Sequence, residues 1–284
     1  MATFTNQATL FYNNTRTASN VVQGEIIDVL TATKTALTDD YTLDDQITYI
    51  VSIVNAGDSA FTGLSLSDDL GAYSFGSGSR VPLDYVDGSL RYFVNGVLQT
   101  TPGVEAGAPL VAGNISVPAG GNALIVYTVR ANSYAPLGEA GEITNTATIS
   151  GGGLISPITA QDTIAALNDV RLSLSKAICP ATVTENGQLT YTINIYNYGS
   201  RAAVATDNLI INDTFEPILE NISVRFNGAA WSAPANYSYN SATGLFSSNP
   251  GQITVPAATI TQNTTTGEWS VTPGVSTLVI TGTV

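Results

Sequence analysis

An internal repeat constrains the fold of this chain more than any other feature of its 284 residues. Residues 30–70 begin LTATKTAL and run through QITYIVSIVNAGDSAFTGLSLSDDL. Residues 172–215 begin LSLSKAIC and run through QLTYTINIYNYGSRAAVATDNLIINDTF. The two stretches align nearly without gaps, and NALIVYTV (122–129) also matches STLVITGTV (276–284). The chain therefore consists of two copies of one unit of roughly 120–140 residues.

Each copy reads as a series of short strands. The segments TYIVSIV, LRYFV, ALIVYTV and TLVITGTV are rich in β-branched and aromatic residues, mostly alternate, and are separated by Gly, Asn, Asp and Pro. No window has a convincing helical period. We therefore expect an all-β fold with two tandem immunoglobulin-like antiparallel β-sandwich domains, over residues 28–153 and 168–284, joined by a linker at 154–167.

The two copies differ in their closing segment. The first copy closes with EITNTATISGGG (142–153), and no such segment follows the last predicted strand of the second copy. Residues 4–14, FTNQATLFYNN, match ITNTATISGGG, with Asn6 on Asn145 and Ala8 on Ala147. The 27 residues between Asn6 and Lys34 (7–33) compare with 30 between Asn145 and Lys176 (146–175).

This match predicts that residues 1–12 are a donor strand, followed by a linker at 13–27. The strand would complete the second domain of another subunit through Phe4, Asn6, Ala8 and Leu10. A head-to-tail contact of this kind builds an open filament. The alternative is that the strand folds back onto its own second domain.

Each copy also places one lysine, one aspartate and one asparagine on an apolar strand face. These residues are Lys34, Asp68 and Asn145 in the first copy, and Lys176, Asp213 and, from the N-terminus, Asn6 in the second. Burial favours a neutral, nucleophilic lysine, and a protonated aspartate can polarise a carboxamide and relay protons. This is the chemistry that a spontaneous Lys–Asn isopeptide bond needs. The alternative is a buried Lys–Asp ion pair with Asn as a hydrogen-bond partner.

The repeat resembles a known family. An opening strand with Lys, a G/DQxTY motif, N-x-G, an apolar strand ending in Asp and a closing TNTAT are similar to the conserved repeat domain of unknown function found in tandem on surface proteins of Gram-positive bacteria and some archaea. The resemblance covers most of residues 28–150 and 168–284, and implies a stalk or fibre module.

The Lys, Asp and Asn arrangement is similar to the isopeptide domains of Gram-positive pilins and adhesins. That similarity implies nucleophilic lysines, relay aspartates and acceptor asparagines. It implies one bond within the chain, Lys34 to Asn145, and one between chains, Lys176 to Asn6.

Composition excludes several classes of function. The net charge of −13 repels nucleic acid, and the absence of His removes Ser-His-Asp catalysis and the usual zinc sites. The single cysteine, Cys179, excludes an intrachain disulfide, and no apolar run approaches a membrane span. The acidic residues Asp39, Asp40, Asp44 and Asp45 lack EF-hand spacing. We therefore expect no metal and no cofactor.

The sequence thus predicts a non-enzymatic, extracellular structural subunit that polymerises with itself on a cell or spore surface. It does not identify a receptor. The opening MATFTNQATL lacks a signal-peptide pattern, which suggests a spore appendage or a removed leader. One alternative is a monomeric adhesin or carbohydrate-binding module. Another is a glycosidase with paired carboxylates, which is disfavoured because Asp68 and Asp213 lie in different domains.

Overall fold

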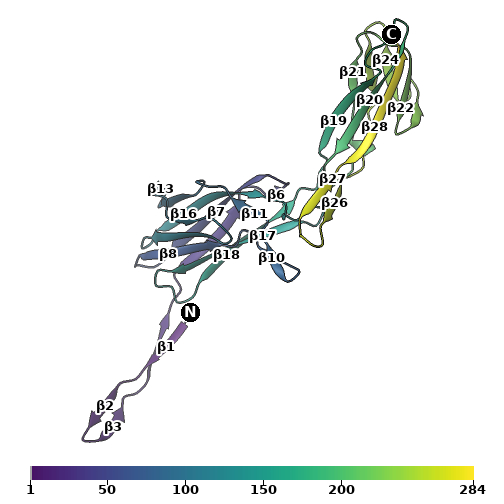
Figure 1. Cartoon of the computed structure of the whole chain (residues 1–284). Coiled ribbons are helices and arrows are strands. Elements are labelled where there is room, and N and C mark those ends of the chain that lie inside the picture. Colours follow the sequence, from purple (N-terminus) through teal and green to yellow (C-terminus); the bar gives the residue numbers. More distant parts are fainter. Residues whose placement is uncertain (1) are drawn as a thin grey trace. The chain divides into compact units, whose positions relative to one another are not determined.

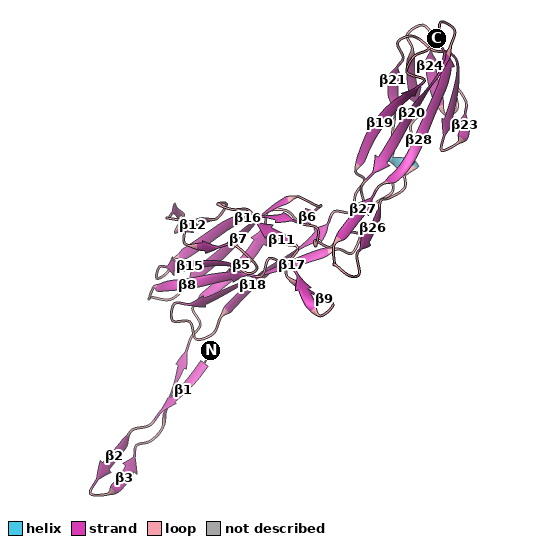
Figure 2. Cartoon of the chain, viewed as in Figure 1, coloured by secondary structure: helices cyan, strands magenta, loops and turns pink. Residues whose placement is uncertain are grey.

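A computed structural model describes residues 2–284 of the chain. Over these residues the protein is all-β, with one 3-10 turn, η1 (Ala205–Asp207), and otherwise strands and loops (Figure 2). No helix within residues 2–284 has the length and apolar character needed to cross a membrane. The chain divides into two compact units. One holds the described residues up to Asp39, Gln46–Arg130 and Thr144–Thr163, and the other holds Asp40–Asp45, Ala131–Ile143 and Ile164–Val284.

The first β-sandwich has two mainly antiparallel sheets (Figure 1). One has the order β13-β12-β16-β7-β5, with β11 also on β16; the other has the order β14-β15-β8-β17-β18-β6, in which β18 and β6 are parallel. The first sheet comprises β5 (Leu30–Ala36), β7 (Gln46–Asn55), β11 (Leu83–Tyr85), β12 (Arg91–Val94), β13 (Val97–Leu98) and β16 (Asn122–Ala131). The second comprises β6 (Asp40–Tyr41), β8 (Phe61–Asp68), β14 (Val104–Glu105), β15 (Leu110–Val117), β17 (Glu142–Gly151) and β18 (Ile158–Ala166). A separate hairpin joins β9 (Tyr73–Phe75) and β10 (Gly78–Arg80).

Alternation decides which side chains form this core. In β7 the side chains of Ile47, Tyr49, Val51 and Ile53 are buried, whereas those between them face away from the core. The same period-two pattern runs along β16 and β17. The predicted all-β sandwich fold is confirmed.

The first sandwich extends further along the chain than the sequence indicated. Residues 154–167, expected as a linker, contain β18, which lies beside β17 in the sheet. Gly151, Gly152 and Gly153 all have positive φ, so the chain turns back there with little strain. The segment ITAQDTIAA buries small residues, Ala160 and Ala166 among them, which gave only a weak strand signal.

The second β-sandwich repeats the first sheet of the first sandwich. Its order is β19-β20-β28-β22-β23, and Lys176 pairs with Ile193 as Lys34 pairs with Val51. Its opposing sheet has only the order β21-β25-β24, and a further ladder joins β26 and β27. The first sheet comprises β19 (Leu172–Cys179), β20 (Gln188–Asn197), β22 (Glu220–Phe226), β23 (Ala229–Trp231) and β28 (Gly274–Thr283). The others are β21 (Asn212–Thr214), β24 (Tyr237–Asn240), β25 (Leu245–Ser248), β26 (Thr259–Gln262) and β27 (Trp269–Thr272).

The opposing sheet of the second sandwich has an open edge. In the first sandwich β8, which carries Asp68, pairs with β15 on one side and β17 on the other. In the second, β21, which carries Asp213, is the last strand of its sheet and pairs only with β25 among the described strands. The described residues thus give the second sandwich no counterpart of β17 or β18.

The N-terminal segment forms a long hairpin. Strand β1 (Ala2–Asn6) pairs with β4 (Val22–Ile26), and β2 (Thr9–Tyr12) pairs with β3 (Thr15–Ala18) (Figure 1). The turn is made by Asn13 and Asn14, both with positive φ, as a two-residue hairpin turn requires. Residues 13–27, expected as a linker, therefore supply the second arm of a hairpin whose first arm is the expected donor strand. Its apolar side chains, such as Phe4 and Leu10, are exposed.

Candidate functional site: two lysine–aspartate pairs

Lys34 lies inside the first sandwich. It sits on β5 opposite Val51, and its alternation with Leu30 and Ala36 turns the side chain into the core. Its Nζ lies 2.6 Å from Asp68 Oδ2, and both side chains are completely buried. The ammonium also lies 4.7 Å from the ring centre of Tyr49 and 6.0 Å from that of Tyr127. Lys34 therefore bridges the two sheets within an aromatic enclosure.

Asp68 ends β8, and both of its carboxylate oxygens have partners. The Tyr127 hydroxyl donates to Oδ2, the oxygen that also contacts Lys34, and the backbone N–H of Leu70 donates to Oδ1 at 3.0 Å. These contacts fix the carboxyl group between a lysine nitrogen and a tyrosine hydroxyl. That is the position a proton relay needs.

Asn145 is fully buried on β17, the strand that pairs with β8 through Ala147 and Asp68. Neither its amide nitrogen nor its amide oxygen has a hydrogen-bond partner within residues 2–284, and the Tyr49 hydroxyl is likewise without one there. Buried carboxamides normally form hydrogen bonds. The buried Asn55 does so, because its amide group donates to the carbonyls of Ser59 and Pro118 and accepts from the Gly57 N–H. The side-chain carboxamide of Asn145 is thus buried and has no hydrogen bond that fixes its position.

Burial dominates the electrostatics of this site. It lowers the pKa of Lys34, and the Asp68 carboxylate opposes that shift only in part. Burial raises the pKa of Tyr49 and of Tyr127, and the Asn145 carboxamide lowers both in part. The carboxamide thus acts on both tyrosine hydroxyls around Lys34, although none of its contacts meets hydrogen-bond geometry. The site brings together a lysine whose pKa is lowered by burial, a carboxyl group and a carboxamide without hydrogen-bond partners.

The second sandwich repeats the lysine–aspartate pair in an open setting. Lys176 Nζ lies 2.6 Å from Asp213 Oδ2, but the side chains are 40% and 16% exposed. The Lys176 ammonium lies 4.4 Å from the ring centre of Tyr191 and 5.2 Å from that of Phe215. Tyr191 occupies the register of Tyr49. The residue opposite it is Ile280, where the first sandwich has Tyr127, so the second pair lacks this hydroxyl.

Every residue of β19, the strand that carries Lys176, is exposed. Leu172, the counterpart of Leu30, is 40% exposed against 5% for Leu30, and Leu174 is 60% exposed. Together with Ile210 and Ile211 these leucines line a groove of about 360 Å³. The groove lies where the first sandwich has its closing strands.

Among the described residues, Asn6 pairs within the N-terminal hairpin. It pairs with Val22 in the β1–β4 ladder, and its neighbours Phe4, Ala8 and Leu10 are exposed. The structure thus brings Lys34, Asp68 and Asn145 together, brings Lys176 and Asp213 together, and records Asn6 with its own hairpin. Tyr49 and Tyr127 were missed from the sequence, because inward tyrosines on alternating strands look like ordinary core residues.

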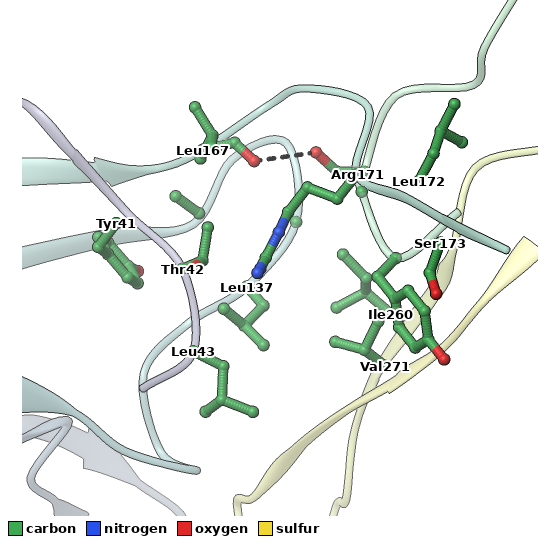
Figure 3. A pocket seen from close by; sticks show the side chains of 15 residues that line it. Tyr41, Thr42, Leu43, Leu137, Leu167, Arg171, Leu172, Ser173, Ile260 and Val271 are labelled. Carbon is green, nitrogen blue, oxygen red and sulfur yellow. Dashed lines mark hydrogen bonds between the residues drawn. The ribbon is translucent and has the colours of Figure 1, made fainter. Parts of the chain in front are cut away.

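A separate pocket of about 400 Å³ lies in the second compact unit and contains none of the predicted site residues (Figure 3). Leu43, Leu137, Ile260 and Val271 line it, together with the guanidinium group of Arg171. Two further lining residues are joined by a hydrogen bond that the Ser200 hydroxyl donates to the Leu167 carbonyl at 3.2 Å. These contacts suit packing rather than chemistry.

Comparisons with known proteins give only distant matches. No family model and no curated protein matches the sequence. Among solved structures, the chain is similar to the pilus backbone protein RrgB of Streptococcus pneumoniae (10% identity, TM-score 0.35, 86% of this chain and 55% of that chain) and to the major pilin SpaD of Corynebacterium diphtheriae (11%, 0.36, 86% and 59%). It is also similar to the collagen-binding domain of a Staphylococcus aureus adhesin (12%, 0.31, 47% and 96%). The chain spans little more than half the length of the two pilins.

Proposed function

We propose that this protein is the structural subunit of a bacterial extracellular or spore-surface filament that assembles head to tail. The observation that carries the proposal is the open groove beside Lys176 and Asp213. It stands where the first sandwich holds β17, and the N-terminal segment repeats the β17 sequence. An exposed strand edge beside apolar side chains is a template for strand addition.

In the proposed contact, residues 1–12 of one subunit add to β21 of the next. In the first sandwich Ala147 pairs with Asp68, and Asn145 lies two residues further along the same face. Ala8 and Asn6 hold the corresponding positions in the N-terminal strand. Adding this strand would therefore bring Asn6 to the open pair of Lys176 and Asp213 and cover the exposed leucines of β19.

Within the first sandwich, the proposed reaction joins Lys34 to Asn145. The neutral lysine amine attacks the carboxamide carbon of Asn145, a new C–N bond forms, and the original C–N bond of the amide breaks. Asp68 gives a proton to the carboxamide and takes one from the attacking amine, so that the leaving group departs as ammonia. Each bond thus removes one ammonia and needs no external oxidant or cofactor.

Between subunits, the same reaction would join Lys176 to Asn6. Insertion of the donor strand excludes water from the lysine–aspartate pair, so reaction follows docking. The filament would then be held by covalent bonds in addition to strand pairing. The protein acts on its own side chains once, and the proposal assigns it no external substrate.

The test is electrophoresis of assembled protein after boiling in SDS under reducing conditions. The wild type should give a ladder of dimers, trimers and larger species. Asn6→Ala and Lys176→Ala should each still form filaments in electron micrographs but run as monomers. Asn145→Ala is the matched control, because it removes only the bond within a chain and should keep the ladder.

Two outcomes would contradict the proposal at different levels. Wild-type filaments that run as monomers would remove the intermolecular bond and leave strand donation. Discrete monomers in micrographs and in size-exclusion chromatography would remove filament assembly and favour a monomeric adhesin or carbohydrate-binding module.

A further inference from the structure

We infer that the donated element is the whole N-terminal hairpin, residues 2–26, and not its first strand alone. This inference rests on the proposed function and specifies what enters the groove. Its second arm, β3 and β4, would supply the second sandwich with a counterpart of β18.

The first sandwich closes with two strands. Beside β17 lies β18, whose Ala160, Ile164 and Ala166 side chains are buried. From β18 the Asp162 carboxylate also accepts a hydrogen bond from the backbone N–H of Ala36, on the edge strand β5, at 2.6 Å. Strand β18 therefore covers the core beside β17 and ties the second sheet to the edge of the first.

Within the described residues, the second sandwich has no counterpart of β17 or β18. Side chains that these strands would cover are therefore exposed on β19. Ile178, the counterpart of Ala36, is 42% exposed, whereas Ala36 is 8% exposed. A single donated strand would replace β17 and pair with β21. It would leave the Ile178 end of β19 without the contact that β18 makes in the first sandwich.

The register of the hairpin fits the place of β18. In the first sandwich the backbone N–H of Ala166 donates to the Gly141 carbonyl, and the Thr144 and Thr163 hydroxyls lie 2.8 Å apart, which sets Asp162 opposite Asn145. In the hairpin Val22 pairs with Asn6, the match of Asn145, so Val22 takes the place of Asp162. Asp162 contacts β5 at Ala36, so Val22 would lie against Ile178, whose exposed apolar side chain it can cover.

The hairpin is also already formed in the single chain. It contains five ladder pairs between β1 and β4 and four between β2 and β3. Donation of the first strand alone would break all of them, whereas donation of the hairpin keeps them. Three residues (27–29) then connect β4 to β5, and five (167–171) connect β18 to β19. The connection between subunits would thus be built like the one within the chain.

One experiment compares three charged substitutions in the full chain, measured as the critical concentration for filament assembly. Val22→Lys would place a charge against Ile178 if β4 is donated, and should raise that concentration at least about tenfold. Gln23→Lys is the matched control, because its counterpart Thr163 is exposed, and it should assemble like the wild type. Ala8→Asp tests the donor strand itself, because its counterpart Ala147 is completely buried.

The outcomes separate the two ideas. If Ala8→Asp blocks assembly while Val22→Lys behaves like Gln23→Lys, the hairpin inference is wrong and strand donation stands. If all three variants assemble like the wild type, strand donation itself is wrong. Val22 is exposed in the single chain, so an unchanged melting temperature of the unassembled Val22→Lys variant will confirm that it folds.

A second experiment locks the hairpin. Thr5 and Gln23 are directly paired, so the double variant Thr5→Cys, Gln23→Cys, with Cys179→Ser, places a disulfide across the ladder. Hairpin donation predicts that the oxidised variant assembles as readily as its reduced form. Assembly only after reduction would show that the hairpin must open, and would overturn the inference.

Discussion

Replacement of Asn145 by alanine tests the proposed Lys34–Asn145 bond, because the free energy of unfolding should fall if the bond forms and should not fall if it does not. Lys34 and Asn145 are 111 positions apart in the sequence. A covalent link that closes a loop of this size removes unfolded-state entropy worth about 5 kcal/mol, by analogy with a disulfide. If the bond forms, Asn145→Ala should lower the free energy of unfolding of the first sandwich by about that amount, or its melting temperature by roughly 15 °C.

The unreacted alternative predicts the opposite sign. A buried amide without partners costs about 1–3 kcal/mol, and Asn145 is buried with both amide atoms unpartnered in the described structure. Removing it would relieve that cost and leave a small cavity worth about 1 kcal/mol. Without a bond, Asn145→Ala should therefore be neutral or stabilising.

The measurements are calorimetry and intact mass on unassembled protein. The wild-type mass should fall short of the sequence mass by one ammonia, and the Asn145→Ala mass should show no such loss. Asn55→Ala is the control, because it removes a buried asparagine that has its hydrogen bonds and should destabilise the protein without changing the deficit of one ammonia. A full sequence mass for the wild type, with an Asn145→Ala variant that melts no lower, would refute the covalent interpretation.

Three further predictions follow from the same contacts. In Asn145→Ala, Lys34 binds fewer protons in the folded state than in the unfolded state between its lowered pKa and 10.5, so denaturation should show a free energy of unfolding that rises with pH through that window. Tyr127→Phe removes the hydroxyl that contacts the Asp68 carboxylate, and the proposed loss of ammonia, followed by mass spectrometry during refolding, should slow at least about tenfold. Leu30→Ala should cost about 2–5 kcal/mol in unassembled protein, whereas Leu172→Ala at the exposed counterpart should cost less than about 1 kcal/mol in the same melts.

The sequence predicted those features that depend on alternation and repetition. The period-two pattern of QITYIVSIVN places Tyr49 and Val51 in the core, and the offset between the copies places Lys176 in the register of Lys34. Burial of Asn145 follows from the same alternation on β17. These properties are local, so one strand carries enough information to predict them.

Features that depend on pairing between distant segments were not predicted. Strand β18 was expected as a linker because ITAQDTIAA has small and polar residues, and its position depends on β17 and on the Ala36–Asp162 hydrogen bond. The second arm of the hairpin was expected as a linker because nothing in β3 or β4 identifies β1 and β2 as partners. The contact of Tyr127 with Asp68 joins residues 59 positions apart and needs both sheets in place.

The two lysine–aspartate pairs share a separation of 2.6 Å and differ in exposure, and that difference orders the proposed assembly. The first pair is closed by β17 within its own chain, so its reaction can follow folding. The second pair is already held together, but its side chains are partly exposed. Since only an inserted strand both excludes water and delivers a carboxamide, the second reaction cannot precede correct docking. The covalent bond between Lys176 and Asn6 would then form only between subunits whose strands are already paired in the correct register.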